Sequence, residues 1–188
     1  YDSKEYRARI SPRFRLNDKI SMVYVLSLRN RYNELGYVDN LAINEELSIP
    51  LFSLRNTYMI TNVLSGSYII NNKIDFSFKL RYHLDQVENV NFRELDNEGY
   101  LSPLSVPLTE QNYDINYSTW TSDIGINWWF APGSKLSLVW KNGVDNETNN
   151  IQNNWFENID ESFTLPQQNS LSLKVVYYLD YLYLKKRI

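Results

Sequence analysis

The sequence contains no cysteine, a single histidine and only six glycines among its 188 residues. The absence of cysteine excludes a disulfide framework and a thiolate metal site. With His83 as its only histidine, the chain cannot build a zinc site of ordinary composition from its own residues. No stretch approaches the roughly 18 apolar residues of a membrane-spanning helix. The formal net charge of -3 gives no reason to expect nucleic acid as a partner.

Aromatic residues are abundant instead. They make up 15% of the chain, with 15 tyrosines and 5 tryptophans, although the mean hydropathy is -0.45. Many aromatic side chains in a chain that is polar on average are typical of a transmembrane β-barrel. Its strands alternate apolar residues toward lipid with polar residues toward the lumen, so the average hides the membrane-facing half.

Hydrophobic and polar residues alternate with period two along most of the chain, which predicts β-strands. The clearest segment, 74–85, has hydrophobic residues at even positions and polar or charged residues at odd positions. Strands of a soluble sandwich also alternate, but they average about 5–6 residues, whereas most of these segments continue for roughly 10–14 residues, enough to cross a bilayer at a tilt. The seven predicted strands are 4–14, 20–29, 54–70, 74–85, 120–130, 135–141 and 171–183.

The predicted connections alternate between short and long. The short ones are 16–19, 71–72 and 131–134, and the long ones are 33–50, 86–113 and 144–168. Outer-membrane barrels have short periplasmic turns and long extracellular loops. The long loops hold fourteen of the 22 acidic residues and one of the 19 basic residues. Two explanations of these acidic loops remain open: simple solvation, or divalent cations that bridge them to surface polysaccharide or lipid head groups.

The sequence therefore predicts an all-β, antiparallel, up-and-down transmembrane barrel, with residues 1–188 as the C-terminal portion of one barrel domain. The predicted location is the bacterial outer membrane, with the long loops extracellular and the C-terminus periplasmic. Bacterial barrels have an even number of strands, and an open edge in lipid would leave backbone groups unpaired at several kcal/mol each. We therefore expect a processed or excised chain whose first residue lies outside, and whose barrel is completed by an upstream part of the same protein.

Basic residues recur on the polar side of four successive predicted strands. If that side is the lumen, they stack into a ladder of the kind that selects anions. The alternative is that Asp75, Asp85, Asp114, Asp123 or an upstream plug neutralises them. The ladder consists of Arg7, Arg9, Arg13, Arg29, Arg31, Arg55, Lys79 and Arg81.

Aromatic residues near the strand ends predict the aromatic girdle of a membrane interface, where such rings lie at the level of the lipid head groups. In a soluble protein they would instead fill a core. The predicted girdle consists of Trp128, Trp129, Phe130, Tyr177, Tyr181 and Tyr183.

Catalytic residues, metal ligands and cofactor sites are not predicted. His83 is interpreted as a hydrogen-bonded lumen residue rather than a general base. The acidic pairs Glu45-Glu46 and Asp160-Glu161 lie in predicted loops, and a glycosidase pair would need a fold that sets two carboxyls about 5–9 Å apart. The chain contains neither a glycine-rich phosphate loop nor a nucleophile elbow.

Three stretches carry a resemblance to a known family: NVLSGSYIINNK at 62–73, WWFAPGSKLSLVWK at 128–141 and NSLSLKVVYYLDY at 169–181. Over about residues 55–188 the chain resembles the C-terminal barrel of a Bacteroidota outer-membrane family of unknown function. In that family a domain similar to carbohydrate-binding module family nine precedes the barrel. One departure is the strand ending in Arg81-Tyr82-His83-Leu84, which lacks an expected tryptophan. The resemblance implies an association with glycans, and it brings no catalytic residues.

Three functions remain open on this basis. The first is a surface anchor or transport pore linked to glycan handling, without catalytic chemistry in this chain. The second is a structural subunit of a larger outer-membrane complex, and the third is a membrane-embedded hydrolase. The expected partners are outer-membrane lipid, the remaining N-terminal part of the same barrel, and either other complex subunits or surface glycan.

Overall fold

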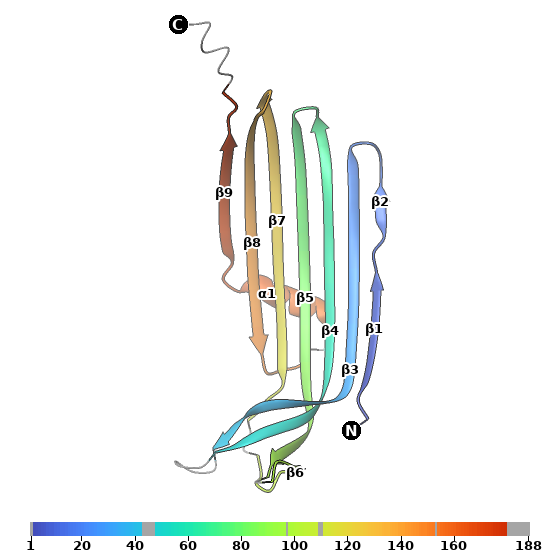
Figure 1. Cartoon of the computed structure of the whole chain (residues 1–188), viewed down its shortest axis with the longest axis vertical. Helices are drawn as coiled ribbons and strands as arrows, with labels where there is room; N and C mark the ends of the chain where they lie inside the picture. The colour runs from blue at the N-terminus through green and yellow to red at the C-terminus, as the bar shows by residue number, and fades with distance from the viewer. Residues whose placement is uncertain (1, 43–47, 97, 109–110, 153, 180–188) are drawn as a thin grey trace, which may run out of the picture.

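A computed structural model describes residues 2–42, 48–96, 98–108, 111–152 and 154–179. They form one antiparallel sheet in the order β1-β3-β4-β5-β7-β8-β9, with the short strands β2 and β6 paired to β3 and β5 (Figure 1). The elements are β1 (Lys4–Ile10), β2 (Arg13–Arg15), β3 (Ile20–Ala42), β4 (Ser48–Asn71), β5 (Ile74–Leu95), β6 (Leu101–Pro103), β7 (Ile115–Ala131), β8 (Ser134–Thr148), α1 (Trp155–Thr164) and β9 (Gln168–Val176).

The predicted all-β class and antiparallel arrangement are confirmed. Each predicted segment occupies its own place in the sheet, in sequence order. β1 and β2 share one place beside β3, and the pairing is interrupted at Ser11 and Pro12 because proline has no N–H to donate. The Pro12 carbonyl still accepts a hydrogen bond from the Tyr24 N–H, at 3.1 Å. β1 and β9 lie at opposite edges, and the sheet is not closed into a barrel.

The predicted long loops are wrong in much of their length, because the strands continue into them. β3, β4 and β5 are 23, 24 and 22 residues long. Bulges interrupt the pairing between Arg31 and Glu34, and again between Tyr37 and Asp39. Each bulge inserts a residue into one strand, so the alternation loses its phase and a strict period of two no longer identifies the strand.

The loop predicted at 144–168 contains α1, which the sequence analysis missed. Asn154 caps this helix by accepting a hydrogen bond from the Phe156 N–H at 3.1 Å, and its Nδ2 donates to Glu157 at 2.9 Å. This side-chain pair resembles a capping box, and Pro166 follows just after the helix ends. Within the described ranges, no helix is both long enough and apolar enough to span a membrane.

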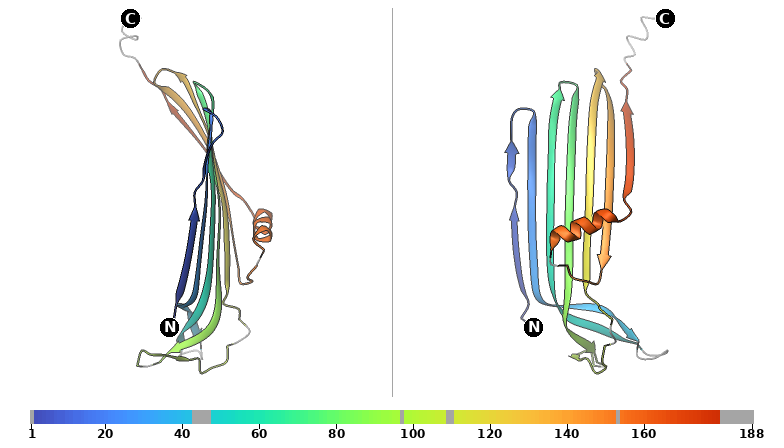
Figure 2. Two further views of the ribbon diagram at one scale, coloured as in Figure 1. Left: turned by 90° about the vertical axis from the view of Figure 1, so that its right-hand side faces the viewer. Right: turned by 180° about the vertical axis from the view of Figure 1, so that it is seen from behind.

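The short turns all lie at one end of the sheet, as predicted. In Figure 1 they are at the top, whereas the distal parts of β3 to β5 bend away at the bottom. α1 crosses one face of the sheet toward that lower end (Figure 2). The sheet therefore has two distinct faces and two distinct ends.

Candidate functional site

One face of the sheet, here called the apolar face, is built from hydrophobic residues that the strand register places side by side. Between the short turns and α1, this face carries no charged side chain among the described strand residues. Several of its members are exposed in the chain, including Ile10 at 56% and Leu171 at 69%. Its principal members are Ile10, Met22, Tyr24, Leu26, Leu28, Ile60, Leu64, Phe76, Phe78, Leu80, Tyr82, Leu84, Trp120, Ile124, Ile126, Leu136, Leu138, Trp140, Leu171, Leu173 and Val175.

Some polar groups within the apolar face bond to one another, whereas Asn62 Nδ2 and the Tyr82 hydroxyl are shielded from solvent without a hydrogen-bond partner among the described residues. The Tyr24 hydroxyl donates to Asn62 Oδ1 at 2.6 Å. Trp140 Nε1 and Asn142 Nδ2 both donate to Asn169 Oδ1, at 3.1 and 3.2 Å.

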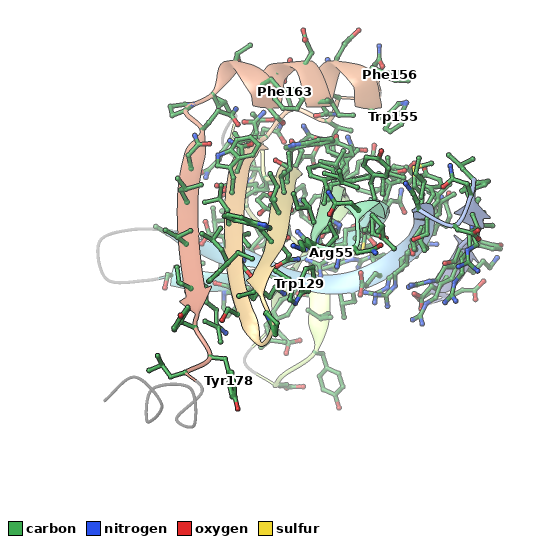
Figure 3. The ribbon with its side chains drawn as sticks, turned by 90° about the horizontal axis from the view of Figure 1, so that it is seen from above. Arg55, Trp129, Trp155, Phe156, Phe163 and Tyr178 are labelled. Atoms are coloured by element: carbon green, nitrogen blue, oxygen red, sulfur yellow. The ribbon has the colours of Figure 1, made fainter. Side chains whose placement is uncertain are left out.

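The opposite, polar face carries all eight residues of the predicted basic ladder, but in separate groups. Arg7 and Arg29 face each other across β1 and β3, and Lys79 and Arg81 lie on β5. Between these groups, β4 presents Met59 opposite Arg29, Val63 opposite Arg81 and Ser65 opposite Lys79, rather than further bases. Arg55 belongs to the end of the sheet beyond α1; in Figure 3 it lies away from the helix.

Five of the eight bases have a carboxylate within 4.0 Å. Glu5 pairs with Arg7 at 2.6 Å, with Arg31 at 3.4 Å and also with Arg29. The Arg7 hydrogen bond, followed by a weaker contribution from Arg31, lowers the pKa of the exposed Glu5 carboxyl, while desolvation opposes that shift.

The other two carboxylates complete this pairing. Glu34 pairs with Arg31 at 2.5 Å and with Arg55 at 3.9 Å, and Asp123 pairs with Arg81 at 2.8 Å. The remaining ladder residues, Arg9, Arg13 and Lys79, have no such partner among the residues described.

Glu5 and Glu34 were missed as partners by the sequence analysis. For Glu5 a signal exists, because it stands two residues before Arg7 and so shares its face in a strand. For Glu34 no such signal exists, since the bulge after Arg31 changes the phase. Of the predicted neutralising residues, Asp123 forms an ion pair, whereas Asp75 accepts a hydrogen bond from Asn127 at 2.8 Å.

His83 lies on the polar face, where its Nδ1 is 2.8 Å from the Thr61 hydroxyl. Asp160 and Glu161 lie in α1, and Glu45 and Glu46 lie outside the described residues. Within the part of the chain that the structure describes, no three histidine, aspartate or glutamate side chains gather as a metal site.

Aromatic rings of the predicted girdle gather at the short-turn end. The Trp128 and Phe130 ring centroids are 5.6 Å apart, and Phe130 stacks on Tyr177 at 6.2 Å. Trp129 has a different environment, with the Lys135 ammonium 4.6 Å above its ring. Tyr181 and Tyr183 lie outside the described residues.

α1 is held on the apolar face by a buried polar network that the sequence did not reveal. Asn158 and Ser162 have no exposed surface. Asn158 Oδ1 accepts from Asn116 Nδ2 at 2.7 Å, and the hydroxyls of Ser162 and Ser118 are 3.0 Å apart. Gln86 Nε2 donates to Asn116 Oδ1 at 2.7 Å, which extends the network to β5.

A cleft of about 430 Å³ opens beside the first turn of α1. Its walls are aromatic, aliphatic and amide side chains with one carboxylate, and none of its lining residues is basic. Asn30 Oδ1 is shielded from solvent and has no hydrogen-bond partner among the described residues. Such walls suit a neutral ligand rich in hydroxyl groups better than an anion. The lining consists of Asn30, Tyr32, Asn56, Thr57, Tyr58, Ile60, Leu84, Gln86, Glu88, Ile151 and Trp155.

Comparison with known proteins places the chain in a family without giving it an activity. No curated protein and no solved structure matches it significantly. One family model, described as a domain of unknown function, DUF5916, matches residues 1–188. The chain therefore belongs to the DUF5916 family.

Proposed function

We propose that this chain forms part of the wall of a bacterial outer-membrane β-barrel, with the apolar face toward lipid and the polar face toward the lumen. The observation that carries this proposal is the charge-free band between the short turns and α1. Along β5 the band runs from Ile74 to Leu84. Ten steps of about 3.3 Å, tilted by roughly 40°, span about 25 Å, which is the height of the apolar band of such barrels.

The two ends of the band fit this orientation. Rings of Trp128, Phe130 and Tyr177 lie at the short-turn end, whereas Tyr82 and Trp120 lie beside α1 at the other. Two aromatic belts separated by an apolar band are what a barrel wall needs at its two interfaces. In this proposal the short turns are periplasmic and the α1 end is extracellular.

The open edges of β1 and β9 belong to the same proposal. In lipid their unpaired backbone groups would each cost several kcal/mol, so further strands must pair with both. The remaining part of the same protein is the natural source of these strands. The resemblance to Bacteroidota outer-membrane proteins that carry a domain similar to carbohydrate-binding module family nine supports this arrangement.

The proposal is tested by gel migration of the complete protein after expression in an outer membrane. Folded barrels migrate faster before boiling than after it. We expect the fast band to survive Ser77→Asp on the polar face and to be lost in Phe78→Asp on the apolar face. A wild-type protein without a heat-dependent shift would contradict the proposal.

A second candidate function, saccharide binding, is favoured by the cleft beside α1. Aromatic faces of Tyr58 and Trp155 can pack on sugar rings, while amides bond to hydroxyl groups. We expect maltopentaose, used as a neutral oligosaccharide probe, to show saturation transfer from the protein in NMR. The signal should fall in Asn30→Ala and persist in Asn146→Ala, which lies outside the cleft. Equal signals in both variants would remove this candidate.

A further inference from the structure

The three sides of α1 differ in chemistry. At 3.6 residues per turn, Trp155, Ile159 and Phe163 align with Phe156 along one side of the helix. Glu157, Asp160 and Glu161 lie along another side. Asn158 and Ser162, between these two sides, are fully buried against the sheet. The aromatic and acidic sides of the helix therefore face different directions along the sheet surface, and neither of them is the side that packs on the sheet.

The aromatic side of α1 faces the short-turn end of the sheet. The rings of Trp155 and Tyr82 are 6.3 Å apart, and those of Phe163 and Trp120 are 5.4 Å apart. The sheet-facing contact of Ser162 is with Ser118 on the same strand as Trp120. Because β7 runs toward the short turns with increasing residue number, Trp120 is nearer to them than Ser118 is.

The sheet beneath α1 changes composition at the level of the helix. Toward the short turns the apolar face continues through residues such as Leu80. Beyond the helix the same face presents Asn30, Asn56, Gln86 and Glu88. α1 thus lies on the border between a charge-free surface and a polar one.

The aromatic side of α1 is only partly covered. Phe156 is 65% exposed and Phe163 is 49% exposed, although each belongs to a helix that is fixed by buried hydrogen bonds. Figure 3 shows Trp155, Phe156 and Phe163 along the helix on one side of the sheet. Exposed rings beside an apolar sheet surface form one continuous apolar patch with it, which is a mark of a membrane or protein contact.

We propose that α1 is an interfacial helix that lies against the barrel wall in the outer-leaflet head-group layer. Its aromatic side dips toward the hydrocarbon, and its acidic side faces the aqueous exterior. This inference rests on the proposed membrane orientation of the apolar face. Helices with one aromatic and one charged side take this position at bilayer surfaces, and aromatic rings favour the interface.

Site-directed spin labelling of the complete protein in phosphatidylcholine vesicles tests this proposal, and this chain adds no cysteine of its own. Labels are placed at Phe156→Cys on the aromatic side, at its neighbour Glu157→Cys on the acidic side, and at Leu80→Cys in the middle of the apolar face. Collisions with oxygen, which concentrates in lipid, are compared with collisions with a water-soluble nickel complex. We expect the oxygen-to-nickel ratio at 156 to exceed that at 157 severalfold and to approach that at 80.

The outcomes separate the two claims. If 156 and 157 are equally accessible to nickel while 80 is accessible to oxygen, the interfacial helix is overturned and the barrel wall stands. If the label at position 80 is itself accessible to nickel, or to neither reagent, both the barrel wall and the interfacial helix are contradicted. Phe156 and Glu157 are both exposed, but Glu157→Cys removes the acceptor of Asn154 Nδ2 at the helix cap. Heat-dependent gel migration therefore checks the fold of all three labelled variants.

Discussion

Placing one charge on either face of β8 discriminates between the two faces of the sheet. Leu138 lies on the apolar face and its neighbour Val139 on the polar face, and both are half-buried. Leu136 shares the face of Leu138 but lies two residues nearer to the short turn at Ser134. The three variants Leu138→Arg, Val139→Arg and Leu136→Arg therefore differ in face or in depth, and hardly in size.

The expected loss in the free energy of unfolding depends on how deep each residue lies within the apolar band. Four residues of about 3.3 Å separate Ser134 from Leu138, and at a tilt of roughly 40° this is about 10 Å, close to the middle of a band about 25 Å tall. An arginine at that depth on a lipid face destabilises a barrel by about 2–4 kcal/mol, and near the interface by about 0–1 kcal/mol. We therefore expect a loss of about 2–4 kcal/mol for Leu138→Arg, and of at most about 1 kcal/mol for Leu136→Arg. Val139→Arg should change the free energy of unfolding least.

The assay is guanidinium unfolding of the complete protein in phosphatidylcholine vesicles, followed by tryptophan fluorescence. If protein rather than lipid covered the apolar face, Leu138→Arg would also destabilise the chain, but the loss would not depend on the distance of the residue from the turn. Equal losses for Leu136→Arg and Leu138→Arg would therefore refute the lipid-facing assignment. Equal losses for Leu138→Arg and Val139→Arg would refute the difference between the two faces.

Three further predictions concern the helix, a close strand contact and the polar face. Asn158→Ala leaves the buried Asn116 Nδ2 without its acceptor, at a cost of about 1–3 kcal/mol, so the backbone amides of α1 should exchange with deuterium faster. Unchanged exchange would show that Asn158 does not hold α1 on the sheet. Gly66→Ala would place its Cβ 2.6 Å from an aromatic ring of the next strand, so a chemical-denaturation titration should show a loss of about 1–3 kcal/mol. Gly143→Ala, with its nearest contact at 3.7 Å, should lose little, and equal losses would contradict the close contact. Reversing two of the three ladder charges that lack a carboxylate partner, with Arg9→Glu and Lys79→Glu, should shift the reversal potential in planar bilayers toward cation selectivity, and unchanged selectivity would exclude an anion-selective lumen.

The sequence predicts the faces of the sheet well because side-chain direction has a strict period of two in a regular strand. Segment 74–85 is an example: its even and odd residues fall on the apolar and polar faces as predicted. The prediction fails where bulges shift the phase of the alternation, as between Arg31 and Glu34. Beyond such a bulge the strand continues, but a strict period of two no longer identifies it. α1 was missed because its sheet-facing residues are Asn158 and Ser162, so no apolar stripe marks the buried side.

The candidate site is less predictable than the fold. The positions of the ladder bases on one face follow from alternation, but their neutralisation depends on which strands are adjacent. Glu5 reaches Arg29 only because β1 pairs with β3 in that register. The cleft beside α1 likewise arises from residues of β3, β4 and β5 together with the segment leading into the helix. No local pattern in the sequence encodes such a juxtaposition.

Contact between the apolar face and lipid is tested most directly through Trp140, which lies on that face near the middle of the band and is 38% exposed. A variant of the complete protein that keeps Trp140 as its single tryptophan is reconstituted with phosphatidylcholines brominated at different depths. We predict strong quenching of the Trp140 fluorescence, greatest with bromine deep in the acyl chains, and little quenching by acrylamide in the water. Free quenching by acrylamide with no effect of the brominated lipids would contradict this prediction.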